Sequence, residues 1–207
     1  MKVSILIPLY NQEDLIQKCL DSIPKRSDIE IIVIDDCSTD NSFNIVKEKY
    51  PHVKLIKNPI NLGVGLTRNR LLDVATGEYV FFLDSDDYIY PDVFSDIVDN
   101  DLKNDIILKP MCERNDGHKW FSGVHRGDFV KRSFIGDTRH PNKRCNEDSD
   151  FKYMLKNKPG FNLRKVNKVV YHYNEPRLNS LTWNYRKSQN MPGYDKGIEE
   201  WEEVHKK

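Results

Sequence analysis

Three carboxylates within four residues follow directly on an apolar run, and this stretch of the sequence is the one best suited to chemistry. Residues 79–83 predict a buried strand, and open α/β sheets bind ligands where their strands end. Asp84, Asp86 and Asp87, which we call the acidic turn, would repel one another unless a cation lay among them. The spacing predicts a divalent metal site suited to a phosphate-bearing ligand, with a solvated acidic turn as the plainer alternative.

Strand and helix patterns alternate through the first 110 residues and must position that turn. Apolar runs predict strands, and capping and turn residues predict helices between them. The expected strands are 3–8, 30–34, 53–56, 79–83 and 105–109, and the expected helices follow Asn11, the segment 38–40, Gly65 and residue 90, with Pro91 in a first helical turn. This order implies a single α/β domain with a mostly parallel sheet flanked by helices.

Other polar residues come directly after the predicted strands. Asn11 follows the first strand, and Asp35 and Asp36 follow the second. Because parallel strands end at one edge of a sheet, we expect these residues to lie near the acidic turn.

The pattern weakens beyond residue 110. Residues 114–123 are expected to form a loop, 128–135 and 148–155 helices, 163–173 a strand, and 183–207 a helical tail. Net charge divides between the two parts: residues 1–100 carry 10 Lys and Arg against 17 Asp and Glu, and residues 101–207 carry 22 against 15. The acidic part suits cation binding, and the basic part suits an anionic ligand, acceptor or surface, unless the two simply neutralise each other.

The composition is that of a globular protein, with 38% apolar and 31% charged residues. The sequence has no apolar run long enough for a membrane-spanning helix and no signal-peptide cleavage pattern at its start. Its four cysteines form no CxxC pair, which argues against a zinc site or a disulfide framework. We therefore expect a cytoplasmic protein, with peripheral attachment to the inner membrane face as an alternative.

Five motifs give the first hundred residues a specific resemblance. They are VSILIPLYN at 3–11, IDDCSTD at 34–40, NLG at 61–63, TRNR at 67–70 and FLDSDD at 82–87. In order and spacing they resemble family 2 glycosyltransferases of the GT-A fold, although Cys37 and Thr67 stand where that family commonly has Gly and Ala. The resemblance implies that residues 1–110 form a nucleotide-sugar-binding half and 111–182 an acceptor and catalytic half.

The resemblance also implies roles in donor binding. Tyr10 would stack on the base, Asp36 would accept a hydrogen bond from the imide of uracil, and Arg68 would face the diphosphate. The full predicted nucleotide-sugar site comprises Pro8, Tyr10, Asn11, Asp36, Asn61, Gly63, Arg68, Asp84 and Ser85. Asp35 is expected only to shape its turn.

Metal and acid–base roles follow from the same resemblance. Asp86 would hold Mn²⁺ or Mg²⁺ between the two phosphates, because hard oxygen ligands suit these ions. Asp84 would meet the ribose or sugar and share the metal, Asp87 would share it or cap the next helix, and His172 is a further candidate ligand. Arg177 is an alternative phosphate contact.

A second acidic pair, Glu147 and Asp148, resembles the family's motif at the start of a helix. Asp148 would be the general base that activates the acceptor, and Glu147 would orient the acceptor or the loop. A plain acidic helix start is the alternative reading.

The expected activity is metal-dependent, inverting transfer of a hexose or N-acetylhexosamine, with a UDP-sugar as donor. The acceptor would be a hydroxyl of a carbohydrate, glycolipid or polymer; a modified base in nucleic acid is also open, although no nucleic-acid-binding motif supports it. A non-catalytic sugar-nucleotide-binding scaffold and an aspartate-dependent phosphatase are the alternatives. The sequence leaves the sugar, the acceptor and the oligomeric state open.

Overall fold

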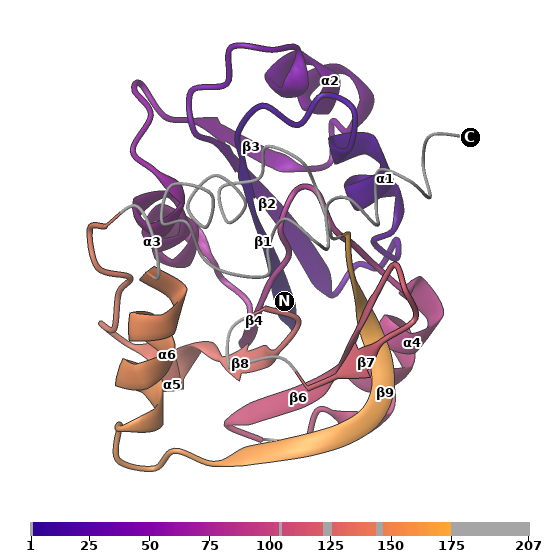
Figure 1. Ribbon diagram of the computed structural model, residues 1–207, viewed down its shortest axis with the longest axis vertical. Coiled ribbons are helices and arrows are strands. Elements are labelled where there is room, and N and C mark those ends of the chain that lie inside the picture. The colour runs from indigo at the N-terminus through magenta and orange to yellow at the C-terminus, as the bar shows by residue number, and fades with distance from the viewer. Residues whose placement is uncertain (1, 104, 122–125, 144–146, 175–207) are drawn as a thin grey trace, which may run out of the picture. The chain divides into compact units, whose positions relative to one another are not determined.

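The computed structural model describes residues 2–103, 105–121, 126–143 and 147–174 (Figure 1). Met1–Tyr173 forms one compact unit, and Asn174–Lys207 forms a second that, apart from Asn174, lies outside the described residues. The expected tail at 183–207 and Arg177 therefore lie outside the described part of the chain. None of the described helices is long and apolar enough to cross a membrane.

Four parallel strands form the first part of the sheet. The central β1 (Val3–Leu9) pairs with β2 (Ile29–Asp35) on one side and with β4 (Tyr79–Phe82) on the other, and β3 (Lys54–Lys57) extends the sheet beyond β2. The β1 strand is buried along its whole length, as its continuous apolar run predicts. Asp36 and the acidic turn follow β2 and β4, as the sequence predicts.

The second part of the sheet mixes strand directions. Here β8 (Phe129–Lys131) lies antiparallel to both β4 and β6 (Ile107–Arg114), while β9 (Leu163–Tyr173) runs parallel to β6. Two short strands, β5 (Tyr88–Ile89) and β7 (Lys119–Trp120), pair antiparallel with β9 and β6. The order is β3-β2-β1-β4-β8-β6-β9-β5, so "mostly parallel" holds strictly only for its first four strands.

Helices cover both faces of this sheet and enclose two apolar cores. On one face lie α1 (Ile16–Asp21), α2 (Ser42–Lys49), α4 (Pro91–Asp96) and its π-helical continuation η1 (Ile97–Asp101). On the other lie α3 (Val64–Val74), α5 (Arg132–Ile135) and α6 (Glu147–Lys156). Alternate residues of β1 and β2 divide between the two cores, because successive side chains of a strand point to opposite faces.

Three local expectations need correction. Asn11 does not cap α1: Asn11 has a left-handed φ of 50°, and α1 starts only at Ile16, with Leu15 at its N-cap. The expected helix at 128–135 is strand β8 followed by the single turn α5, because residues 129–131 complete the sheet between β4 and β6. The expected loop at 114–123 contains β7, which pairs with the end of β6. Pro91 does open α4, as predicted.

Candidate functional site

The acidic turn brings three carboxylates together at the carboxyl end of β4. One oxygen from each of Asp84, Asp86 and Asp87 lies within 4.8 Å of the others. Asp87 is buried, and the other two are half-buried. Burial and the neighbouring charges of Asp86 and Asp84 raise the pKa of Asp87, although a hydrogen bond from Tyr171 opposes that shift. The three carboxyl groups are therefore close enough to disfavour one another's charged forms, an arrangement that a cation would relieve.

Two arginines hold Asp84. Its Oδ1 lies 2.7 Å from Arg68 Nη2, and its Oδ2 lies 2.9 Å from Arg126 Nε. Burial by itself would raise the pKa of Asp84, but the charges of Arg126 and Arg68 and their hydrogen bonds lower it. Asp84 is therefore held as an anion, as its place in a charged site demands.

Arg68 joins the two acidic motifs of the sequence. Its Nη1 donates to Glu147 Oε1 at 2.9 Å while its Nη2 holds Asp84, so one buried guanidinium bridges the acidic turn and the start of α6. Gly65 allows this approach, because a Cβ there would lie 3.0 Å from Cγ of Glu147. Burial raises the pKa of Glu147, and the charge of Arg68 opposes that rise.

Asp148 lies beside this bridge in the first turn of α6. Its side chain is half-buried, and its Oδ1 accepts a 2.8 Å hydrogen bond from the backbone N–H of Ser149. The first turn of a helix favours an anion there. The predicted base therefore directly follows Glu147, the residue that Arg68 links to Asp84 of the acidic turn.

Asp36 shapes the loop that leads into α3. Its Oδ1 accepts from the backbone N–H of Leu62 and its Oδ2 from that of Gly63, each at 2.8 Å. Asn61 Nδ2 donates to the backbone oxygen of Asp36, and Gly63 takes the positive φ of 84° that this turn needs. The predicted residues Asp36, Asn61 and Gly63 therefore form one structural unit, with Asp36 as its anchor.

Asn11 ties the end of β1 to the loop after β2. Its N–H donates to Ser38 Oγ at 3.0 Å, and its Oδ1 accepts from the N–H of Thr39 at 2.9 Å. Tyr10, beside it, is 46% exposed, whereas Pro8 is buried in β1 opposite Ile34. An exposed aromatic ring at this edge is available for stacking, and Pro8 lines the sheet beneath.

Asp35 and Ser85 are also buried. Both oxygens of Asp35 accept from the N–H of Ser38, at 3.3 and 3.2 Å, which matches the turn-shaping role expected for it. Ser85 lies within the acidic turn, between Asp84 and Asp86.

His172 does not join the acidic turn. Its ring stacks on Tyr88 with centroids 4.2 Å apart, and its two nitrogens lie 3.1 Å from Tyr90 Oη and 2.7 Å from Asn115 Oδ1. The group of candidate metal ligands among the described residues contains the three aspartates without His172. In this arrangement its ring nitrogens are engaged elsewhere, so the structure does not support the expected metal-ligand role.

Arg126 and Tyr171 are the site residues that the sequence did not single out. The Tyr171 hydroxyl donates to Asp87 Oδ2 at 2.5 Å and accepts from the Asp84 N–H at 3.2 Å. The Arg126 guanidinium packs 4.8 Å from the ring of Tyr173 and pairs with Asp84. No motif surrounds Arg126, and only the basic excess of residues 101–207 hinted at a cation from this part of the chain.

The donor set of the acidic turn fits a hard divalent ion. Carboxylate oxygens are the ligands that Mg²⁺ and Mn²⁺ prefer, and the three carboxylates offer oxygens close enough for a shared ion after small adjustments. Each oxygen of Asp84 also lies beside an arginine, and Asp87 accepts a hydrogen bond from Tyr171.

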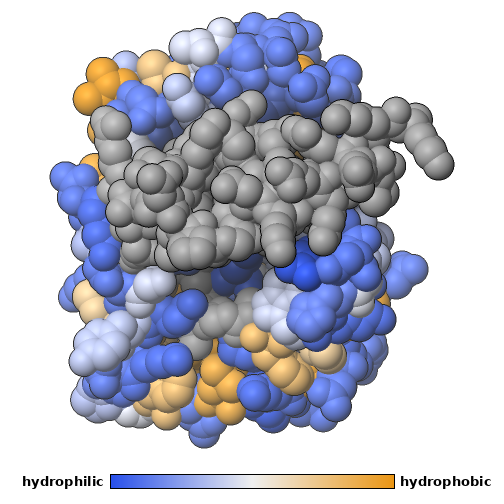
Figure 2. Space-filling view, viewed as in Figure 1, coloured by the Kyte–Doolittle hydropathy of each residue, from blue (hydrophilic) through white to orange (hydrophobic). Residues whose placement is uncertain are grey.

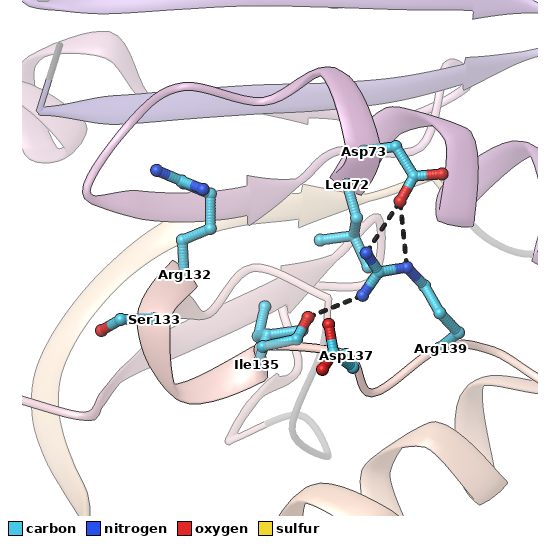
Figure 3. A pocket seen from close by; sticks show the side chains of 8 residues that line it. Leu72, Asp73, Arg132, Ser133, Ile135, Asp137 and Arg139 are labelled. Atoms are coloured by element: carbon cyan, nitrogen blue, oxygen red, sulfur yellow. Dashed lines mark hydrogen bonds and ion pairs between the residues drawn. The ribbon is translucent and has the colours of Figure 1, made fainter.

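A separate hollow between α3 and α5 has a volume of about 360 Å³ but offers less chemistry (Figure 3). Arg139 turns onto Asp73, with Nη2 at 2.7 Å from Oδ1, and Arg132 Nε donates to the backbone oxygen of Gly77. These cations are committed to internal partners.

Much of the visible described surface is hydrophilic (Figure 2). The large exposed apolar side chains among the described residues are Tyr10, Ile60, Tyr153 and Met154.

The sequence and the fold match known proteins. A family model described as "Glycosyl transferase family 2" matches residues 4–157. The chain is 40% identical over 130 residues to the "Uncharacterized glycosyltransferase YibD" of Escherichia coli, covering 58% of this chain and 38% of that protein. It is 50% identical over 97 residues to the "Poly(ribitol-phosphate) beta-glucosyltransferase" of Bacillus spizizenii, covering 43% of this chain and 15% of that protein.

Among solved structures, Staphylococcus aureus TarS 1–349 in complex with UDP-GlcNAc superposes with a TM-score of 0.76 at 23% identity. The match covers 88% of this chain and 61% of that one, and it shows the GT-A fold. Of the two curated relatives, the chain spans only 38% of the E. coli protein and 15% of the B. spizizenii protein.

Proposed function

This chain belongs to glycosyl transferase family 2, and from that premise we propose that it is a metal-dependent, inverting enzyme that uses a UDP-sugar. One observation carries the proposal: Arg68 bridges Asp84 and Glu147 and so joins the acidic turn to the predicted base at the start of α6. A binding protein would need the donor edge alone, whereas the bridge assembles donor and acceptor chemistry in one place.

The donor half of the proposal rests on the edge formed by β1, β2 and β4. Tyr10 would stack on the uracil ring, and Asp36, with loop 61–63 fixed around it, would accept from the imide N–H. A carboxylate oxygen has two lone pairs, so Asp36 Oδ2 can accept this bond besides the one from Gly63. The structural relative TarS carries UDP-GlcNAc in its complex, which supports the choice of uracil.

Asp86 and Asp87 would hold Mn²⁺ or Mg²⁺, which when bound would neutralise charge on the departing diphosphate. Arg68 and Arg126 add fixed positive charge on the Asp84 side of the turn. Because guanidinium groups stay charged at every working pH, they can stabilise a diphosphate without depending on protonation.

Asp148 would act as the general base. Its carboxylate would take the proton from an acceptor hydroxyl as that oxygen bonds to the anomeric carbon and the bond from this carbon to the diphosphate breaks. Attack from the face opposite the diphosphate inverts the anomeric centre. Glu147, held by Arg68, would fix the start of α6 and thereby the position of Asp148.

The acceptor we favour is a hydroxyl of a polymer. The B. spizizenii relative carries poly(ribitol-phosphate) in its name, and residues 101–207 have the excess of Lys and Arg that would suit an anionic chain.

A thermal-shift panel tests the donor half directly. UDP, GDP, CDP and TDP are each added with Mn²⁺, Mg²⁺ or EDTA, since a ligand at 100 times its dissociation constant adds about 2.7 kcal/mol of stability. We expect UDP with metal to stabilise the chain, and the Asp86→Asn variant to lose the effect. Absence of a shift with every nucleotide and metal would refute the donor assignment.

Catalysis is tested separately, against the alternative of a sugar-nucleotide-binding scaffold. UDP-sugars are screened for release of UDP in water and in the presence of polyol-phosphate polymers. The proposal expects metal-dependent release that disappears in Asp86→Asn. If the chain binds UDP with metal but releases no UDP from any UDP-sugar, with or without an acceptor, it is a binding protein.

A further inference from the structure

The buried hydroxyl of Tyr171 bonds directly to the acidic turn, although Tyr171 lies on the last described strand, far along the chain from it. It is fully buried in β9, and its ring packs near Phe81 of β4, with centroids 6.3 Å apart. A buried tyrosine hydroxyl needs hydrogen-bond partners, and the Tyr171 hydroxyl has an acceptor and a donor in the acidic turn.

The two bonds of this hydroxyl reach opposite ends of the turn. Tyr171 Oη donates to Asp87 Oδ2 at 2.5 Å and accepts from the backbone N–H of Asp84 at 3.2 Å. The first bond fixes the direction of a carboxylate, and the second fixes the backbone where the turn starts. The turn closes on itself as well, because the Asp87 N–H donates to the Asp84 oxygen at 3.0 Å.

The position of Tyr171 is itself enforced by its neighbours. A Cβ added at Gly127 would lie 3.1 Å from Tyr171 Cβ and 3.2 Å from Cδ2, so a side chain there would crowd the ring. Gly127 also has a φ of 73°, which a larger residue would adopt only with strain. Gly127 therefore leaves the space that the Tyr171 ring occupies beside the acidic turn.

We infer that Tyr171 is a positioning residue that orients the acidic turn for a divalent metal ion through its bonds to Asp87 and Asp84. This inference rests on the proposed function, because it assumes that the turn holds the metal. A tyrosine that holds a ligating carboxylate acts as an outer-shell partner, and losing such a partner typically weakens metal binding 10- to 100-fold.

Tyr171→Phe keeps the ring and removes only the hydroxyl. We expect it to raise the dissociation constant for Mn²⁺ about 10-fold or more, measured on the full chain by titration with Mn²⁺ followed by electron paramagnetic resonance, with and without UDP. Tyr90→Phe is the matched control: it removes a hydroxyl that bonds Glu113 and His172 outside the turn. We expect this control to bind Mn²⁺ like the unaltered chain.

A double-mutant cycle separates positioning from general loosening. If Tyr171 acts through Asp87, adding Tyr171→Phe to the Asp87→Asn variant should lower the Mn²⁺ affinity much less than Tyr171→Phe lowers it in the unaltered chain. The effects of neighbouring residues that act together are not additive. Additive losses, or an unchanged Mn²⁺ affinity in Tyr171→Phe, would overturn the inference.

Two further outcomes keep the tests distinct. If Tyr171→Phe fails to fold while Tyr90→Phe folds, the hydroxyl is a requirement of the fold and the positioning role is wrong. If the unaltered chain itself binds neither Mn²⁺ nor Mg²⁺, with or without UDP, the metal-dependent proposal fails first, and the inference falls with it.

Discussion

The two parts of the sheet supply the site in different ways. In the parallel part, β1, β2 and β4 end side by side, and their predicted site residues follow those ends directly. Around the mixed part, Arg126 before β8 and Tyr171 of β9 contact the acidic turn, and Glu147 of α6 is linked to it through Arg68. The parallel part thus presents groups along one edge, and the mixed part fixes and completes them.

The comparison assigns different work to the two parts, which mutations can separate. Changes in the parallel part should alter nucleotide binding, whereas changes in the mixed part should alter turnover, stability or, at Tyr171, the affinity of the acidic turn for metal.

The largest expected effect comes from the predicted base in the mixed part. Asp148→Asn should lower kcat by about 10²- to 10⁴-fold, the usual contribution of a general base. Among the described residues its Oδ1 accepts a hydrogen bond from the Ser149 N–H, which the amide oxygen of Asn can also accept, so the exchange should leave the fold intact. The measurement is UDP release in the presence of an active acceptor.

Donor binding provides the control for Asp148→Asn. The stabilisation by UDP and metal should stay the same in this variant and disappear in Asp86→Asn. Loss of the UDP effect in both variants would mean that the two parts do not divide the work as proposed.

The next effect concerns a buried ion pair within the mixed part. Lys109 of β6 and Asp128, before β8, are both buried, and Lys109 Nζ lies 2.7 Å from Asp128 Oδ2. Lys109→Met would leave Asp128 buried without its ammonium partner, which typically costs about 3–5 kcal/mol. Urea unfolding should show this loss of stability.

Lys131→Met is the matched control on β8. Its ammonium lies 3.7 Å from the half-exposed Glu78, and such pairs typically contribute about 0–1 kcal/mol. Equal losses of stability in the two variants would show that the buried pair contributes no more to the stability of the fold than the exposed pair does.

These features also show how far sequence reasoning reaches. The edge residues of the parallel part were predictable, because each strand ends at a polar group and the β-α-β order brings those ends together. The same logic fails at 129–131, where the pattern predicts the start of a helix and the structure has strand β8. It also fails at 114–123, where the pattern predicts a loop and the structure has strand β7. Short antiparallel strands are set by which strand they complete, and three residues carry too little periodicity to show it.

The candidate site divides in the same way. Asp84, Asp86, Asp87 and the Glu147–Asp148 pair lie in contiguous motifs, and the fold brings them together. Tyr171 lies in β9 beside His172, but its hydroxyl bonds to the acidic turn depend on tertiary packing. His172, its neighbour, had the residue type of a metal ligand, yet it points to Tyr90 and Asn115 because alternate residues of a strand face opposite ways.

A smaller effect should appear at the junction of the two parts, where His140 is buried. Its ring stacks on Phe151 of α6 at 4.0 Å, and burial, followed by the charge of Arg68, lowers its pKa to about 3. Between pH 6.5 and about 3 the unfolded chain therefore binds a proton at this residue that the folded chain does not.

The consequence is a loss of stability as the pH falls below 6.5, at about 1.4 kcal/mol per pH unit from this residue, or about 2 kcal/mol by pH 5. His140→Phe, which keeps a stacking ring, should remove that part of the pH dependence. Urea unfolding of both proteins from pH 7 to pH 5 measures the difference in slope. Identical slopes would show that His140 takes up its proton in the folded chain as readily as in the unfolded one.

The smallest effect on stability should come from the exposed edge of the parallel part. Tyr10 is 46% exposed, so Tyr10→Ala should leave the free energy of unfolding within about 0.5 kcal/mol of the original value. Stacking of an aromatic ring on a base contributes about 1–3 kcal/mol, so the dissociation constant for UDP should rise about 5- to 150-fold. Tyr10→Phe keeps the ring and should bind UDP nearly as well. Calorimetric titration with UDP and Mn²⁺ measures all three proteins; a Tyr10→Ala chain with unchanged affinity would remove Tyr10 from the donor edge and leave base recognition to Asp36 and loop 61–63.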